Sequence, residues 1–480
     1  MNGIRVSELF YLLLMISTAG AFFLHPEAGL PYMLCAGVLA APLFLMSVKH
    51  PYRFFLLFTS ISFYLAYLLR PLVLLADVSY FKYSTVAFIG KSDIVDRLYE
   101  LSILMSGVIA GILVAIYLVA PKERINKPDS KSLLVDYSKW IVLVGWGALA
   151  VNLALAVFFR IGLKNVEVTS PHFQFILRLV PTLLMISSCS VLLIMYRKKL
   201  SSSIGMCVAG YLIAAGCFEL LVRGSKAGLA LIFFSLFVVV LTRKNDFQIS
   251  FTKAVTLGVA FVLCCLVTFS LSNRIRYGDA DQGLFERAVS AVSEYSGEVN
   301  LADSVDDFTG RMCGFDGQLV VQISRPSELR RSFVPTVILR NTIARIVPGM
   351  SPATMTTGKA IAVHYNGADR NAKFSGGVGI FGTLTLMSYG NEWLGSLIIG
   401  FLLGMIFRLA QSIRDPGIYI VFHTVFFYYI AQLMISGGIG FVLAHFVIVM
   451  GQAAGLLIAR SFVYDSRPQL SATKQVGVES

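Results

Sequence analysis

The sequence predicts an all-α polytopic membrane protein with about 12 transmembrane helices and one large extracytoplasmic loop. The chain of 480 residues is 56% hydrophobic and only 14% charged, with a mean hydropathy of +0.74. Soluble domains are about 25% charged. The apolar residues come in blocks of about 18–22, which is long enough to cross ~30 Å of hydrocarbon. Clusters of Lys and Arg also recur in alternate loops between these blocks.

The apolar blocks predict twelve spans in order along the chain. They cover residues 8–24, 30–48, 54–75, 99–120, 138–159, 176–196, 204–222, 227–242, 252–272, 390–410, 417–435 and 438–459. Because cytoplasmic loops are enriched in Lys and Arg, the charges in the loops test this division. All the clusters fall on one side if both termini are cytoplasmic, from Arg5 and Lys49 through Arg197 and Arg243 to Arg460.

This topology divides the chain into four parts. Residues 1–272 form spans one to nine, 273–377 form the extracytoplasmic loop, 378–462 form a re-entrant segment with spans ten to twelve, and 463–480 form a cytoplasmic tail. The stretch GGVGIFGTLTLMSYG at 376–390 is apolar but too short to span. Irregular backbone at membrane depth survives only where protein buries it or where it lines a cavity, so this stretch is predicted to re-enter the membrane.

Composition and motifs exclude several classes of function. A net charge of +13 would suggest nucleic acid for a soluble protein, but here it follows from the topology bias or from an anionic lipid substrate, and no nucleic-acid partner is predicted. Six of the seven cysteines lie in apolar spans, which favours core packing over disulfides or metal binding. The sequence has no HExxH, DxD, GxSxG or Walker pattern. We therefore predict no metal and no cofactor.

Cations also gather at the outer ends of the predicted spans. The stretch CFELLVRGSKAGLALIFFS at 217–235 carries three charges, although a charge at the bilayer centre costs roughly 2.5–3.5 kcal/mol. Snorkelling of long side chains to the headgroups or an ion pair between Glu219 and Arg223 would explain single residues. The whole set favours a site for phosphate or pyrophosphate, because guanidinium groups match paired oxygens. It comprises Arg70, Arg160, Arg178, Arg223, Lys226, Arg274 and Arg276.

The outer loop and the start of span ten supply further candidates. Arg345 and Lys359 flank a Pro/Gly turn region in ARIVPGMSPATMTTGKA, shortly before the re-entrant segment. The candidate proton acceptors are Glu392, Asp316 and His364. Each also has a structural alternative: Glu392 as an anchor at the membrane interface, Asp316 as a partner in a hydrogen bond within the loop, and His364 as a surface histidine.

Two of these stretches resemble a known family. Arg345-Ile-Val-Pro, then Lys359, then GVGIFGTLTLMSYGNEWLG from Gly377, resemble the Wzy-type O-antigen or oligosaccharide repeat-unit polymerases, as does Ser225-Lys-Ala-Gly at the start of a helix. As motif the resemblance covers about forty residues. This chain departs from it at Thr383, where the family pattern often has an acid.

The resemblance implies a GT-C-like glycosyltransferase in the cytoplasmic (inner) membrane of a bacterium, with its site facing the periplasm. The donor would be a polyprenyl-pyrophosphate-linked oligosaccharide of O-antigen, capsule or exopolysaccharide assembly. A flippase and a chain-length regulator would be possible protein partners, beside the lipid bilayer. Arg223, Lys226, Arg274, Arg276 and Arg345 would bind pyrophosphate with help from Lys359, and Arg70 and Arg178 would belong to the same site. Glu392, Asp316 or His364 would handle the proton.

Two other functions are compatible with the sequence. A lipid-linked oligosaccharide flippase would also have about twelve spans and a cationic cavity. Such transporters tend to show paired halves and sites near the bilayer midplane, whereas the cations here lie at the outer end. An O-antigen ligase is the second alternative, within the enzymes.

Overall fold

The computed structural model describes most of the N-terminal quarter of the chain and most of residues 314–448. The described stretches are residues 4–46, 52–84, 87–118, 314–324, 327–347, 357–366, 377–388, 390–411 and 416–439, with short pieces elsewhere that include 146–147, 149–155, 210–211, 214–218, 248–249, 305–306, 309, 442–444 and 446–448. All statements about structure below refer to this part of the chain.

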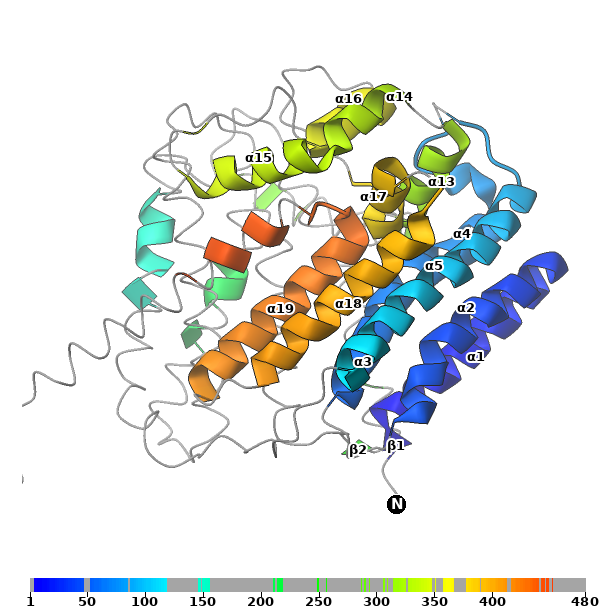
Figure 1. The fold of residues 1–480 in the computed structure, drawn as a ribbon, viewed down its shortest axis with the longest axis horizontal. Helices are drawn as coiled ribbons and strands as arrows, with labels where there is room; N and C mark the ends of the chain where they lie inside the picture. Colours follow the sequence, from blue (N-terminus) through cyan, green and yellow to red (C-terminus); the bar gives the residue numbers. More distant parts are fainter. Residues whose placement is uncertain are drawn as a thin grey trace, which may run out of the picture.

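Long apolar helices form a bundle (Figure 1). They are α1 (Val6–Leu24), α2 (Pro26–Leu45), the continuous run of α3 (Arg53–Phe63), η1 (Tyr64–Leu68) and α4 (Leu69–Ala76), α5 (Lys91–Leu118), α18 (Glu392–Gln411) and α19 (Pro416–Ser436). Five helical segments within the described residues are long and apolar enough to cross a membrane: Val6–Leu24, Pro26–Leu45, Arg53–Ala76, Lys91–Tyr117 and Glu392–Gln411. The prediction of a helical membrane protein is therefore confirmed. The predicted spans at 176–196 and 227–242 lie outside the described residues, as do most of 138–159, 204–222, 252–272 and 438–459.

The two ends of the bundle carry different parts of the chain. Figure 1 shows β1 (Ile4–Arg5) and β2 (Gln248–Ile249) at the lower end, where they pair as two antiparallel strands. At the opposite end, here called the upper end, lie α13 (Phe315–Ser324), α14 (Ser327–Arg330), η4 (Arg331–Phe333), α15 (Pro335–Ile346), α16 (Thr357–Asn366) and α17 (Gly379–Ser388). The segments predicted as cytoplasmic and as extracytoplasmic loops thus lie at opposite ends. Which end faces the cytoplasm stays a prediction.

Helix α5 begins eight residues before the predicted span. The sequence places the start at residue 99, because the preceding residues KSDIVDRL are rich in charge, whereas the helix starts at Lys91. Its first turn is stabilised by the Asp93 carboxylate, which accepts a hydrogen bond from the Gly90 backbone N–H at 2.7 Å. The charge at Arg97 is buried and has partners on other helices. A count of charges along the sequence cannot detect such partners.

Helices α5 and α18 pack closely because glycines face each other. A Cβ at Gly400 would clash with the Val108 carbonyl, and one at Gly111 would clash with the Leu397 carbonyl. Only residues without a side chain allow two helix backbones to approach so closely. This contact fixes the start of α18 against α5, so Glu392 has a defined place at the upper end.

A junction of glycines and one tyrosine holds α13 and α17 to the bundle. The Tyr67 hydroxyl, on the π-helical turn η1, donates to the Met434 carbonyl at 2.9 Å and lies against Gly314 and Gly379. Gly379 has a φ of 67°, a left-handed conformation that side chains disfavour. Helix α17 that follows has only ten residues and is almost entirely buried. It is too short to span a membrane, and its re-entrant position stays a prediction.

Candidate functional site

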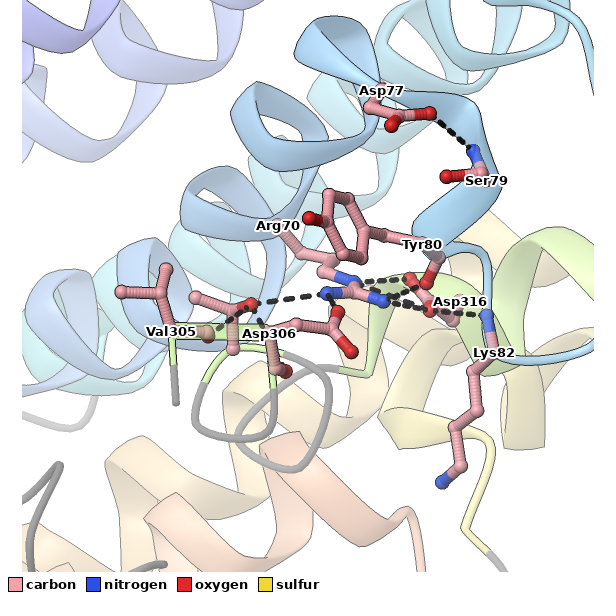
Figure 2. Close-up of polar contacts among 9 residues, drawn as sticks. Arg70, Asp77, Ser79, Tyr80, Lys82, Val305, Asp306 and Asp316 are labelled. Carbon is pink, nitrogen blue, oxygen red and sulfur yellow. Dashed lines mark hydrogen bonds and ion pairs between the residues drawn. The ribbon is translucent and has the colours of Figure 1, made fainter. Parts of the chain in front are cut away.

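A buried arginine forms the centre of a polar cluster at the upper end. Arg70 lies in α4 and its side chain is only 1% exposed. Its Nε lies 3.1 Å from Oδ1 of Asp316 on α13, and its Nη2 lies 3.0 Å from Oδ2 of the same carboxylate (Figure 2). The pair is therefore bidentate, the strongest geometry for a guanidinium and a carboxylate.

The remaining donors of this guanidinium have partners as well. Nη1 lies 2.5 Å from the Asp306 carboxylate and 3.0 Å from the Thr309 hydroxyl, and Nη2 also donates to the Tyr80 carbonyl (Figure 2). Asp316 in turn accepts a hydrogen bond from the Lys82 backbone N–H at 3.2 Å. The cluster thus joins α4, the 78–82 turn region and two parts of the predicted outer loop.

The turn that carries Tyr80 is itself held by a carboxylate. Asp77 ends α4 and accepts a hydrogen bond from the Ser79 backbone N–H at 2.8 Å, which stabilises the short helix η2 (Val78–Tyr80). Hydrogen bonds from the backbone and side chain of Ser79 lower the pKa of Asp77. An ionised Asp77 therefore supports the turn whose carbonyl contacts Arg70.

A second buried arginine lies in the neighbouring helix. Arg97 of α5 forms an ion pair with Glu100 and donates to the side-chain oxygen of Gln322 on α13. The Gln322 amide also donates to the Glu100 carboxylate. With the Gln318 amide oriented so that its oxygen faces Arg97, this oxygen accepts a hydrogen bond from Arg97 Nε at 2.9 Å. Helix α13 is consequently attached to α4 through Asp316 and to α5 through its two glutamines.

Both guanidinium groups already have carboxylate partners. Arg70 contacts Asp306 and Asp316, and Arg97 contacts Glu100. Three carboxylates face two arginines, so these described residues carry no excess positive charge for an anion. An anionic ligand at this end would need other cations.

The predicted proton acceptors lie in three different environments. Asp316 is buried and paired with Arg70. Glu392 is only partly buried in the first turn of α18, close enough to Arg97 to interact with its charge. His364 is exposed on α16, with its ring 4.8 Å from that of Tyr365. The structure thus brings Arg70 and Asp316 together and places Glu392 near a second arginine.

Few of the other predicted residues can be located in detail. Arg345 lies in α15 and Lys359 in α16, but their side chains are outside the description. Arg178, Arg223, Lys226, Arg274 and Arg276 lie outside the described residues, as does Arg160. Thr383, where the resembling family often has an acid, is buried and donates to the Gly437 carbonyl at 3.0 Å. Its hydroxyl serves the packing of α17.

The contact between α16 and the site passes through aromatic rings. The Tyr365 ring lies 5.6 Å from the ring of Tyr83, which directly follows Lys82. Its hydroxyl lies 3.0 Å from the Ser324 hydroxyl at the end of α13. Burial raises the pKa of Tyr365 to about 12, although the hydrogen bond with Ser324 acts in the opposite direction. The phenol therefore stays neutral and joins α16 to α13.

Arg97 is not among the site residues that the sequence predicts. Its signal was present, since Arg97 and Glu100 lie three residues apart at the outer end of the fourth span. The same argument that selected Arg70, a cation on the translocated side of an apolar block, applies to Arg97. The predicted span begins two residues after Arg97, so the pattern of apolar blocks leaves this arginine in the loop.

Comparisons with models of protein families, with curated proteins and with solved structures found no match to this chain.

Proposed function

We propose that this protein is a polysaccharide polymerase, a glycosyltransferase that joins polyprenyl-pyrophosphate-linked oligosaccharide repeat units on the outer face of a bacterial cytoplasmic membrane. In this proposal the chain has about twelve spans, both termini are cytoplasmic and the upper end faces the periplasm. The proposal rests on the resemblance of residues 345–395 to the Wzy-type polymerases and on the charges at the upper end.

One observation supports the proposal above the others. Two arginines, Arg70 and Arg97, are buried and paired with carboxylates where α4 and α5 meet the helices of the predicted outer loop. Ionisable groups within the apolar part of a membrane protein are costly and usually functional. The stretch that resembles the family, residues 377–395, supplies α17 and the start of α18 at the same end.

The geometry assigns different roles to the three proton acceptors. Asp316 is fully buried and bound by Arg70, so a sugar hydroxyl cannot reach it without opening the cluster. We therefore give Asp316 and Arg70 a positioning role. Glu392 is partly exposed, and the packing of α18 on α5 fixes its position. It is our candidate for the base.

The proposed reaction transfers the donor glycan to the acceptor hydroxyl group. The acceptor hydroxyl oxygen attacks the anomeric carbon of the donor, a new C–O bond forms, and the bond to pyrophosphate breaks. The electron pair leaves with the lipid pyrophosphate, and Glu392 takes the hydroxyl proton. Charge on the leaving group grows in the transition state and would be stabilised by fixed cations. We assign this to Arg178, Arg223, Lys226, Arg274, Arg276, Arg345 and Lys359, because Arg70 and Arg97 already hold carboxylates.

The test is the length of the glycan that the protein makes. A strain lacking the gene is complemented with wild type or with Glu392→Gln, and surface polysaccharide is separated on a gel. Wild type should restore a ladder of long chains, whereas Glu392→Gln should leave single units while protein levels in the membrane stay equal. Glu27→Gln, in the first turn of α2, serves as the matched control.

The location of accumulated donor separates the alternatives. Single repeat units trapped on the cytoplasmic side of the membrane in the deletion strain would refute the proposal in favour of a flippase. Long chains that remain on the lipid carrier instead of the final acceptor would refute it in favour of a ligase. Single units outside the membrane support the polymerase.

A further inference from the structure

Helix α15 exposes large apolar side chains and buries polar ones. The side chains of Leu339 and Ile343, four residues apart on one face of the helix, are exposed, as is that of Val347 directly after it, and that of Leu339 is 60% exposed. The buried side of the helix carries Asn341 and Thr342, which are 5% and 7% exposed, beside the apolar Ile338. A helix on the surface of a soluble protein has the opposite arrangement, with its apolar stripe buried and its polar side chains in water.

The spans of this same protein show the same pattern. Helix α1 buries the polar Ser7 and Ser17, while Met15 and Phe23 are exposed, Phe23 to 89%. For a membrane span this arrangement is expected, because the surrounding solvent is hydrocarbon and polar groups must find partners inside the protein. By its exposed surface, α15 resembles a helix that contacts lipid.

The length and charge of α15 indicate how it would contact lipid. It has 12 residues, too few to cross a bilayer. The segment 327–347 carries four arginines, Arg330, Arg331, Arg340 and Arg345, against the single acid Glu328. A short helix with an apolar face and arginines beside it is typical of segments that lie in the membrane interface and attract anionic headgroups.

We propose that α15 lies in the membrane interface at the upper end, with the face of Leu339, Ile343 and Val347 among the acyl chains. Arg331 and Arg340, both exposed, bind the headgroups of anionic phospholipids. Figure 1 shows α15 above α19 and running at a shallower slope than the bundle helices. The inference does not depend on the proposed polymerase activity, because any protein with this helix would bind lipid in the same way.

The experiment measures the surroundings of single spin labels on the full-length protein. Each label is attached to one cysteine introduced into a cysteine-free variant, and the protein is reconstituted into vesicles of phosphatidylethanolamine and phosphatidylglycerol. Collisions with oxygen report acyl chains, and collisions with a water-soluble nickel complex report water. Phe23→Cys on the exposed face of α1 is the lipid control, and Ser79→Cys in the exposed η2 turn is the water control.

Labels at Leu339→Cys and Ile343→Cys should match the Phe23 control, with high oxygen and low nickel accessibility. Values matching the Ser79 control would overturn the proposal. Low accessibility to both reagents would also overturn it, since a protein partner or a second copy would then cover the face. In vesicles of phosphatidylcholine alone, oxygen accessibility at Leu339→Cys should fall, because the arginines lose their anionic headgroups. Adding Arg340→Gln should reduce the difference in oxygen accessibility between the two kinds of vesicle. An unchanged difference would refute the role of Arg340.

Discussion

Replacing Arg70 by Met should destabilise the protein more than removal of any other arginine in the described residues. The substitution leaves Asp316, which is 1% exposed, without its bidentate partner. Breaking a buried ion pair by removing one member costs about 3–5 kcal/mol, because the other charge stays buried and uncompensated. Asp306 is about one third exposed and can return to water, so it should add little to this cost.

The double variant Arg70→Met with Asp316→Leu separates an ion pair from a packing effect. With both charges removed, no uncompensated charge remains, and buried pairs are often replaced by apolar residues at little cost. The double variant should therefore lose less stability than Arg70→Met alone. The coupling between the two positions should lie in the range of about 0.5–3 kcal/mol that contacting residues show.

The assay is unfolding in mixed micelles, with increasing dodecyl sulfate and helix content followed by circular dichroism. Arg408→Met is the matched control, since this buried arginine of α18 donates to the Ala115 carbonyl at 3.4 Å and shows no carboxylate partner in the described residues. It should cost roughly 1 kcal/mol. Equal losses for Arg70→Met and Arg408→Met, or a double variant equal to the sum of its singles, would refute the reasoning.

Three further predictions concern other parts of the fold. Gly400→Ala should cost about 1–3 kcal/mol in the same assay, because the added Cβ meets the α5 backbone. The control Gly37→Ala, where a Cβ meets nothing within 4 Å, should be neutral or slightly stabilising, and equal effects would contradict the packing argument. Because the pKa of Tyr365 is raised to about 12, the phenol of the unfolded chain loses its proton first, and stability should fall as the pH rises from about 10 to 12. Tyr365→Phe should remove this part of the dependence of stability on pH, and an unchanged dependence would show that other groups cause it. Asp77→Ala should speed hydrogen exchange at the Ser79 amide, measured by mass spectrometry. Since the pKa of Asp77 is lowered, the protection of this amide in wild type, taken relative to its intrinsic exchange rate at each pH, should be lost only as the pH falls through that lowered pKa. Unchanged protection in the variant would show that the turn holds without the carboxylate.

The sequence by itself determined the class of protein and the approximate ends of several long helices. Apolar blocks near 8–24, 30–48, 54–75 and 390–410 became α1, α2, the α3–α4 run and α18 with small shifts. The reason is that the hydrocarbon thickness sets a minimum length, and this length can be counted along the chain. The prediction that 376–390 is too short to span follows from the same count, and the structure gives it as the ten-residue helix α17.

Only the tertiary structure decided which charges meet. Arg70 and Asp316 are 246 positions apart, and Arg97 and Gln322 are 225 positions apart, so neither pairing has a signal in local spacing. The sequence suggested Arg70 as a ligand for an anion, whereas its donors contact carboxylates, a carbonyl and a hydroxyl. The outward direction of the apolar face of α15 was likewise invisible in the sequence. Periodicity shows that a helix has two faces, but only its neighbours decide which face meets the protein.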